Sequence, residues 1–147
     1  MKKVFLDTHF LIKLLNNQEA LHQHARAYFK YFLEEKMVII VSALSIGEYC
    51  VHGQLSHLPL KNLQTLNYNV IHAVKAGRYG AVALANRAVI TNDIKLFAQA
   101  ESEKIDYYVT ADTGSKDIYD LMRREDTVSY TFIDIHTPVN ETFGLLF

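Results

Sequence analysis

The segment Val4-Phe5-Leu6-Asp7-Thr8 is a short apolar run that ends at an acidic residue. Consecutive apolar residues without polar alternation are typical of a strand that is buried on both faces. Thr8 is the predicted N-cap of a helix, because apolar residues recur at helical spacing over residues 11–15. The segment therefore predicts a buried strand, a carboxylate at its carboxyl end, and a helix directly after it.

Similar apolar runs recur along the chain and alternate with helical patterns. Further strands are expected at 37–41, 68–72, 107–110 and 130–135. Helices are expected at 19–36, from Ser42 or Ser45 to near Gly53, and at 73–87, 93–105 and 116–124. Strands that are apolar on both faces and alternate with helices predict an α/β fold in which helices cover a parallel sheet.

Length and composition limit the class of protein. The 147 residues, half of them hydrophobic and 21% charged, predict one domain over 1–147 and exclude a disordered chain. The longest uncharged apolar run, 37–47, is shorter than the roughly 20 residues that cross a bilayer, so no membrane segment is expected. The single Cys50 and the lack of a signal-peptide pattern predict a cytoplasmic protein. The net charge of −1 shows no chain-wide basic surface for nucleic acid.

Four acidic residues are candidates for one site. Ligands of an open parallel sheet bind at the carboxyl ends of its strands, where Asp7 and Asp112 are expected. Glu48 and Asp93 lie on predicted helices that could face the same edge. Asp106 precedes the strand that Asp112 follows, about 20 Å away, and is therefore excluded from the site.

Each acid also has an ordinary structural explanation. Asp7 and Asp112 could be turn residues, and Asp93 could complement a helix dipole. Glu48 follows Ser45 at the spacing of a capping box. Against that explanation, its sequence neighbours are apolar, and a charge among apolar residues needs a partner. Together, converging carboxylates repel one another unless cations hold them, and oxygen ligands suit Mg²⁺ or Mn²⁺. Such sites serve phosphoryl chemistry, so the four acids favour a metal-dependent phosphotransfer or hydrolysis site.

Four segments, in this order and spacing, resemble the PIN-domain nucleases, and among them the small VapC-type toxins of bacterial toxin–antitoxin pairs. They are Phe5-Leu6-Asp7-Thr8, Val41-Ser42-Ala43-Leu44-Ser45-Ile46-Gly47-Glu48-Tyr49, Thr91-Asn92-Asp93 and Asp106-Tyr107-Tyr108-Val109-Thr110-Ala111-Asp112. The resemblance implies a three-layer α/β/α sandwich with a central, mainly parallel sheet. It also implies a metal-dependent endoribonuclease in which Asp7, Glu48, Asp93 and Asp112 are the catalytic, metal-binding residues.

One or two Mg²⁺ or Mn²⁺ ions would activate water to attack an RNA phosphodiester. Thr8, Thr110 and Ser115 are expected to orient the acids. The sequence departs from the family at His9, where relatives carry Asn or Ser. His9 could contact phosphate, alter metal preference or be an exposed helix residue.

The other departure follows Asp112, where the usual aromatic residue is missing. Asp117 could assist or replace Asp112, or could complement the dipole of the next helix. Lys116 could contact substrate phosphate or be a solvated lysine.

The resemblance also implies a small antitoxin partner. Four aromatic residues within 28–32 cannot all face one core, which predicts exposed apolar surface and a homodimer that also binds an antitoxin over the first helices. A basic antitoxin side chain would reach the acidic pocket. Alternatively, another part of the same chain covers these aromatic residues.

Three other functions are alternatives to a VapC-type toxin. A phosphohydrolase of the haloacid-dehalogenase kind needs a second Asp two residues after the first, and His9 stands there. The others are a catalytically inactive PIN-like binding module and a housekeeping PIN nuclease without an antitoxin. Divalent-ion binding would separate the inactive module from an enzyme.

Overall fold

A computed structural model describes residues 1–89 and 91–145 and contains a five-stranded sheet in which every neighbouring pair is parallel. The spatial order is β3-β2-β1-β4-β5. The strands are β1 (Lys3–Leu6), β2 (Val38–Ser42), β3 (Gln64–Leu66), β4 (Tyr107–Thr110) and β5 (Thr131–Asp134). The predicted parallel α/β architecture is therefore confirmed.

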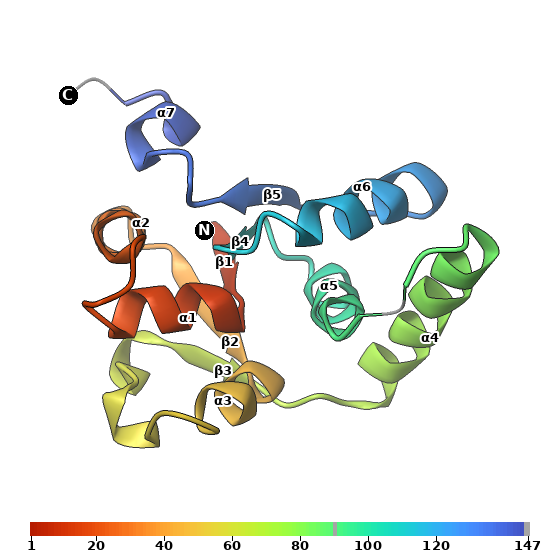
Figure 1. Cartoon of the computed structure of the whole chain (residues 1–147), viewed down its shortest axis with the longest axis horizontal. Helices are drawn as coiled ribbons and strands as arrows, with labels where there is room; N and C mark the ends of the chain where they lie inside the picture. Colours follow the sequence, from red (N-terminus) through yellow and green to blue (C-terminus); the bar gives the residue numbers. More distant parts are fainter. Residues whose placement is uncertain (90, 146–147) are drawn as a thin grey trace.

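Helices cover both faces of this sheet, with α1 and α2 on one side and α4, α5 and α6 on the other (Figure 1). The helices are α1 (Thr8–Leu15), α2 (His22–Glu34), α3 (Ala43–Tyr49), α4 (Val70–Ala85), α5 (Asp93–Ser102), α6 (Ser115–Glu125) and α7 (Val139–Phe143). Short 3₁₀ turns occupy Leu55–His57 and Leu60–Asn62. The expected three layers are present.

The central strands divide their side chains between two cores. Val4 and Leu6 of β1 belong to the core beneath α1 and α2, whereas Phe5 belongs to the core beneath α4, α5 and α6. On that second face the Phe5 ring stacks on Tyr108, with ring centroids 5.5 Å apart. This alternation is the period of two that a strand imposes, and it explains why the apolar run in the sequence is uninterrupted.

The point where the strand order reverses lies between β1 and β4. The backbone N–H of Asp7 donates to the carbonyl of Val109 at 3.2 Å, so the chain leaving β1 stays joined to the end of β4. Asp106 lies at the opposite end of β4, where its carboxylate accepts the Lys3 backbone N–H at 2.8 Å. Asp7 and Asp112 thus follow adjacent strands at the edge where ligands of such sheets bind.

Side-chain caps decide where three helices begin, and two local predictions were wrong. Asp7 caps α1, because its carboxylate accepts the Phe10 N–H at 2.9 Å and Thr8 is already helical. Ser42 caps α3, so Ser45 and Glu48 form no capping box. The strand expected at 68–72 is instead the start of α4, which a reciprocal Asn69–His72 capping box initiates, and β3 lies earlier in the chain.

The aromatic residues of α2 are largely covered by the chain itself. Tyr28 and Phe32 are fully buried, and Phe143 of α7 stacks on Tyr31 with centroids 4.5 Å apart. Phe29 and Tyr31 are half-buried, and Phe29 lines a surface groove. The chain itself therefore covers much of these aromatic residues through α7, which is the alternative named above, while apolar surface remains at the groove lined by Phe29 and Leu33.

Within the described residues, no helix has the length and apolar character needed to cross a membrane.

Candidate metal centre

Asp7 is a fully buried carboxylate held on both oxygens. One oxygen accepts the Phe10 N–H, and the other accepts the hydroxyl of Thr110 at the end of β4. The Thr110 oxygen in turn accepts the backbone N–H of Asp112 at 2.9 Å. Thr110 therefore joins two of the predicted site acids, and its orienting role stays a prediction.

Burial raises the pKa of Asp7 to about 7, despite the opposing effects of the Thr110 and Phe10 hydrogen bonds and of His9. The nearby charge of Asp93 raises this pKa further. A carboxylate with so high a pKa is unfavourable in its charged form until a positive charge lies beside it.

Three side chains from different elements converge at the same edge. His9 comes from α1, Asp93 begins α5, and Asp112 follows β4; each offers one ligand atom, and these atoms all lie within 4.8 Å of one another. His9 Nε2 is 3.6 Å from Asp112 Oδ2. The other Asp112 oxygen accepts the Gly114 N–H at 3.0 Å, which orients the carboxylate.

The charges around Asp93 show that it lies among the other acids. Its pKa is raised first by burial and then by the carboxylates of Asp112 and Glu48, whereas His9 lowers it. Because Asp93 is also in the first turn of α5, it can complement the helix dipole as well as face the site.

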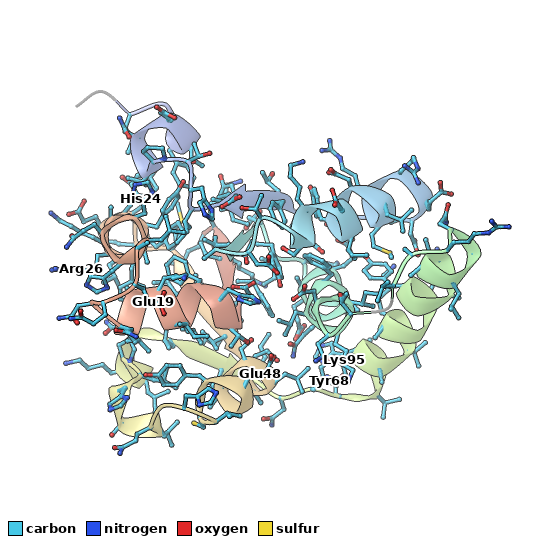
Figure 2. The ribbon with its side chains drawn as sticks, in the orientation of Figure 1. Glu19, His24, Arg26, Glu48, Tyr68 and Lys95 are labelled. Atoms are coloured by element: carbon cyan, nitrogen blue, oxygen red, sulfur yellow. The ribbon has the colours of Figure 1, made fainter. Side chains whose placement is uncertain are left out.

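Glu48 is exposed on α3, so its apolar sequence neighbours do not bury it as expected. Its carboxylate accepts the Thr8 hydroxyl at 3.2 Å, which ties it to the start of α1. Figure 2 labels Glu48 beside α3. Asp7, Glu48, Asp93 and Asp112 therefore all face the carboxyl edge of β1 and β4.

Of the supporting residues, Ser115 lies beside Asp112, because its hydroxyl donates to the backbone carbonyl of Asp112 at 2.8 Å. Lys116 instead pairs with Asp120 on the surface of α6 at 3.1 Å. Asp117 is exposed in the first turn of α6, and among the described residues it is not part of the convergent group. The structure therefore brings neither Lys116 nor Asp117 to the site.

Tyr108 is a polar residue near the site that the sequence reasoning missed. Its hydroxyl is fully buried and has no hydrogen-bond partner among the described residues. Burial, followed by the charges of Asp7 and Asp93, raises the pKa of Tyr108 well above its ordinary value. The available signal was a tyrosine inside a strand predicted to be buried on both faces, where its hydroxyl needs a partner.

These residues fit a divalent cation. The donor set is rich in carboxylate oxygens with one imidazole, and the carboxylates of Asp112 and Glu48 raise the pKa of Asp93. Asp93 and Asp112 would hold the cation, with Asp7 and Glu48 beside them.

The comparisons with known proteins agree with this fold. No family sequence model and no curated protein sequence matches the chain. Among solved structures, FitAcB from Neisseria gonorrhoeae is similar at a TM-score of 0.68 and 17% identity, covering 90% of this chain and 98% of that one.

Two further structures carry the Vap designation. VapBC2 from Rickettsia felis, bound to a promoter DNA fragment, has a TM-score of 0.66 and 15% identity, covering 90% of this chain and 98% of that one. VapC20 from Mycobacterium tuberculosis, a toxin that cleaves the sarcin–ricin loop, has a TM-score of 0.58 and 18% identity, covering 87% and 99%. At these identities the likeness establishes the architecture, and the chain has the PIN-domain fold of the VapC-type toxins.

Proposed function

We propose that this chain is a Mg²⁺- or Mn²⁺-dependent endoribonuclease and the toxin of a VapBC-type pair. The observation that carries the proposal is the convergence of Asp93 and Asp112 ligand atoms, within 4.8 Å, beside the fully buried Asp7. An acid that only caps a helix or forms a turn gains nothing from two other carboxylates beside it. Their mutual repulsion is relieved by the ion that phosphodiester hydrolysis requires.

One or two bound ions would neutralise phosphate charge and lower the pKa of the attacking water. The chain's own residues hold the acids in place before substrate arrives. Thr110 and the Phe10 N–H orient Asp7, Gly114 orients Asp112, and Thr8 orients Glu48. Such preorganisation avoids the cost of arranging charges during the reaction.

RNA is the proposed substrate because of the likeness to VapC-type toxins, one of which cleaves the sarcin–ricin loop. The geometry favours an enzyme over an inactive binding module. A buried carboxylate with a pKa near 7 among other acids is costly to keep in a protein that binds no cation.

The test is cleavage of total cellular RNA by the purified full-length chain. We expect cleavage with millimolar Mg²⁺ or Mn²⁺ and none in excess chelator, with activity restored when the metal is added back. Equal cleavage in chelator would contradict the metal-dependent reaction. A chain that binds no divalent ion and leaves RNA intact would indicate the inactive module.

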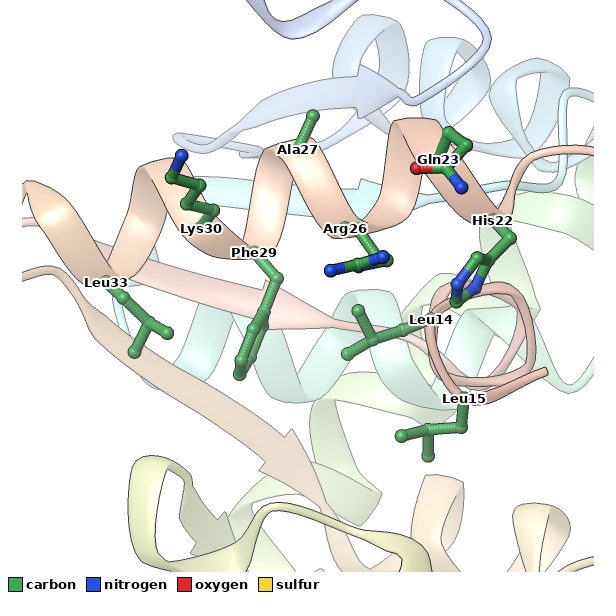
Figure 3. A pocket seen from close by; sticks show the side chains of 9 residues that line it. All are labelled: Leu14, Leu15, His22, Gln23, Arg26, Ala27, Phe29, Lys30 and Leu33. Atoms are coloured by element: carbon green, nitrogen blue, oxygen red, sulfur yellow. The ribbon is translucent and has the colours of Figure 1, made fainter. Parts of the chain in front are cut away.

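A groove of about 660 Å³ between α1 and α2 is the proposed antitoxin site. Leu14, Phe29 and Leu33 point into one space (Figure 3). Arg26 and Lys30 also line the groove, and Lys30 lies 3.8 Å from Glu34. An amphipathic segment with apolar residues toward the groove and acidic residues toward the two cations fits this surface. The similar VapBC2 structure from Rickettsia felis supports an antitoxin as the partner. The proposal also includes a basic side chain of the antitoxin that reaches the acids of the site.

Leu33→Glu is expected to weaken binding of the antitoxin, the product of the adjacent gene, about 30-fold, because it places a charge against the apolar groove. Leu60→Glu is the matched control, since both leucines are 40% exposed and Leu60 lies outside the groove. Titration of the purified proteins by calorimetry measures both affinities. Equal weakening by the two variants would remove the groove from the interface.

The homodimer expected from the sequence stays a prediction. Its best-supported face is α4, where Val70, Val74 and Leu84 are exposed along one side of the helix. Sedimentation velocity of the purified chain decides between monomer and dimer.

A further inference from the structure

His9 occupies a position from which its ring reaches the acids. It is the second residue of α1, the helix that Asp7 caps, so its placement depends on the same turn that positions Asp7. The ring is half exposed, and its Nε2 lies 3.6 Å from Asp112 Oδ2, which is longer than a hydrogen bond. The ring therefore has room to turn toward a third group.

The spacing of the donors matches a coordination shell. In an octahedral shell with bonds of roughly 2.1 Å, adjacent ligand atoms lie about 3 Å apart and opposite ones about 4.2 Å apart. The ligand atoms of His9, Asp93 and Asp112 all lie within 4.8 Å of one another, so small side-chain rotations bring them to one ion. The unpartnered, fully buried hydroxyl of Tyr108 is a second sign that this edge receives a polar ligand.

We propose that His9 is a nitrogen ligand of the metal and that it makes the site prefer a first-row transition ion such as Mn²⁺ over Mg²⁺. The inference rests on the proposed metal-dependent function and adds the identity of one ligand and the direction of metal selectivity. Mg²⁺ binds oxygen ligands almost exclusively, whereas imidazole is a good ligand for transition ions. An Asn at this position would offer only an amide oxygen and would lose that discrimination.

A different role for His9 is donation of a hydrogen bond to a substrate phosphate. The two roles differ in the absence of RNA, because only a metal ligand places its nitrogen on the ion in the free protein. The test is therefore made on the RNA-free, full-length chain loaded with Mn²⁺.

Electron spin-echo spectroscopy of the Mn²⁺-loaded wild-type chain is expected to show ¹⁴N coupling from one imidazole, and His9→Asn is expected to remove it. Calorimetry should show Mn²⁺ affinity falling about ten-fold in His9→Asn while Mg²⁺ affinity changes less than about two-fold. The matched control is His136→Asn, since His136 is similarly exposed and contacts Asp134 outside the site. This control should keep the coupling and both affinities.

Three results would overturn the inference: Mn²⁺ bound without ¹⁴N coupling, coupling that persists in His9→Asn, or equal loss of both metals in that variant. Asp93→Asn separates this failure from failure of the proposed function. If Mn²⁺ binding depends on Asp93 but shows no nitrogen coupling, only the role of His9 is wrong. If Mn²⁺ does not bind the wild type, or binds Asp93→Asn equally well, the metal site itself is wrong.

Discussion

Asp93→Asn is expected to lower RNA cleavage by roughly 100-fold or more while the chain keeps its fold. Loss of a residue that merely orients a metal ligand typically costs about 10- to 100-fold, and loss of a ligand should cost more. The amide is isosteric with the carboxylate, and Asp93 is at the first turn of α5, where Asn is tolerated. Initial cleavage rates at saturating Mg²⁺, with circular dichroism to check folding, measure the effect.

Asp117→Asn is the matched control for that variant. Asp117 is also in the first turn of a helix, α6, but it is exposed and lies apart from the converging ligand atoms of the described residues. The control should retain wild-type cleavage. A comparable loss in Asp117→Asn would show that this residue assists or replaces Asp112, and full activity in Asp93→Asn would remove Asp93 from the site.

The second large effect concerns stability without metal. Metal-free Asp7→Asn is expected to be more stable than the wild type at pH 8, by up to about 4 kcal/mol, and to lose this advantage near pH 4. The Asp7 carboxyl has a pKa of about 7 in the folded chain against 3.8 as its ordinary value. Between these values the folded state binds more protons than the unfolded state, so rising pH destabilises the wild type. Above about pH 7 the buried Asp7 carboxylate is charged in the folded wild type, and the loss of stability is complete. Asn carries no charge at any pH and does not cause this loss.

Urea denaturation in chelator across this pH range measures the difference. Asp106→Asn is the control, because Asp106 lies at the opposite end of the sheet and should show no stability gain that grows with pH. A pH-independent difference for Asp7→Asn would contradict the assignment of the raised pKa to Asp7. With saturating Mg²⁺ the order should reverse, because the ion stabilises the wild-type carboxylate by mass action.

The strands that build the site could be predicted because their signals are local. Residues 4–6 are a continuous apolar run, and residues 107–110 are aromatic or β-branched; both patterns are typical of a strand buried on both faces. Once the sheet is parallel, Asp7 and Asp112 must lie at one edge and Asp106 at the other, as the structure shows. Local competition between caps was harder to judge, since Asp7 and Thr8 are both good capping residues.

The sequence by itself therefore determined the architecture and which edge carries acids, because alternation, apolar runs and strand ends are properties of neighbouring residues. Only the tertiary structure decided which side chains meet there. His9, Asp93 and Asp112 come from three elements, and their approach depends on how α1 and α5 pack beside β4. The same holds for the buried hydroxyl of Tyr108 and for the cover that Phe143 provides over Tyr31. These contacts join residues far apart in the chain, and packing of the two cores determines them.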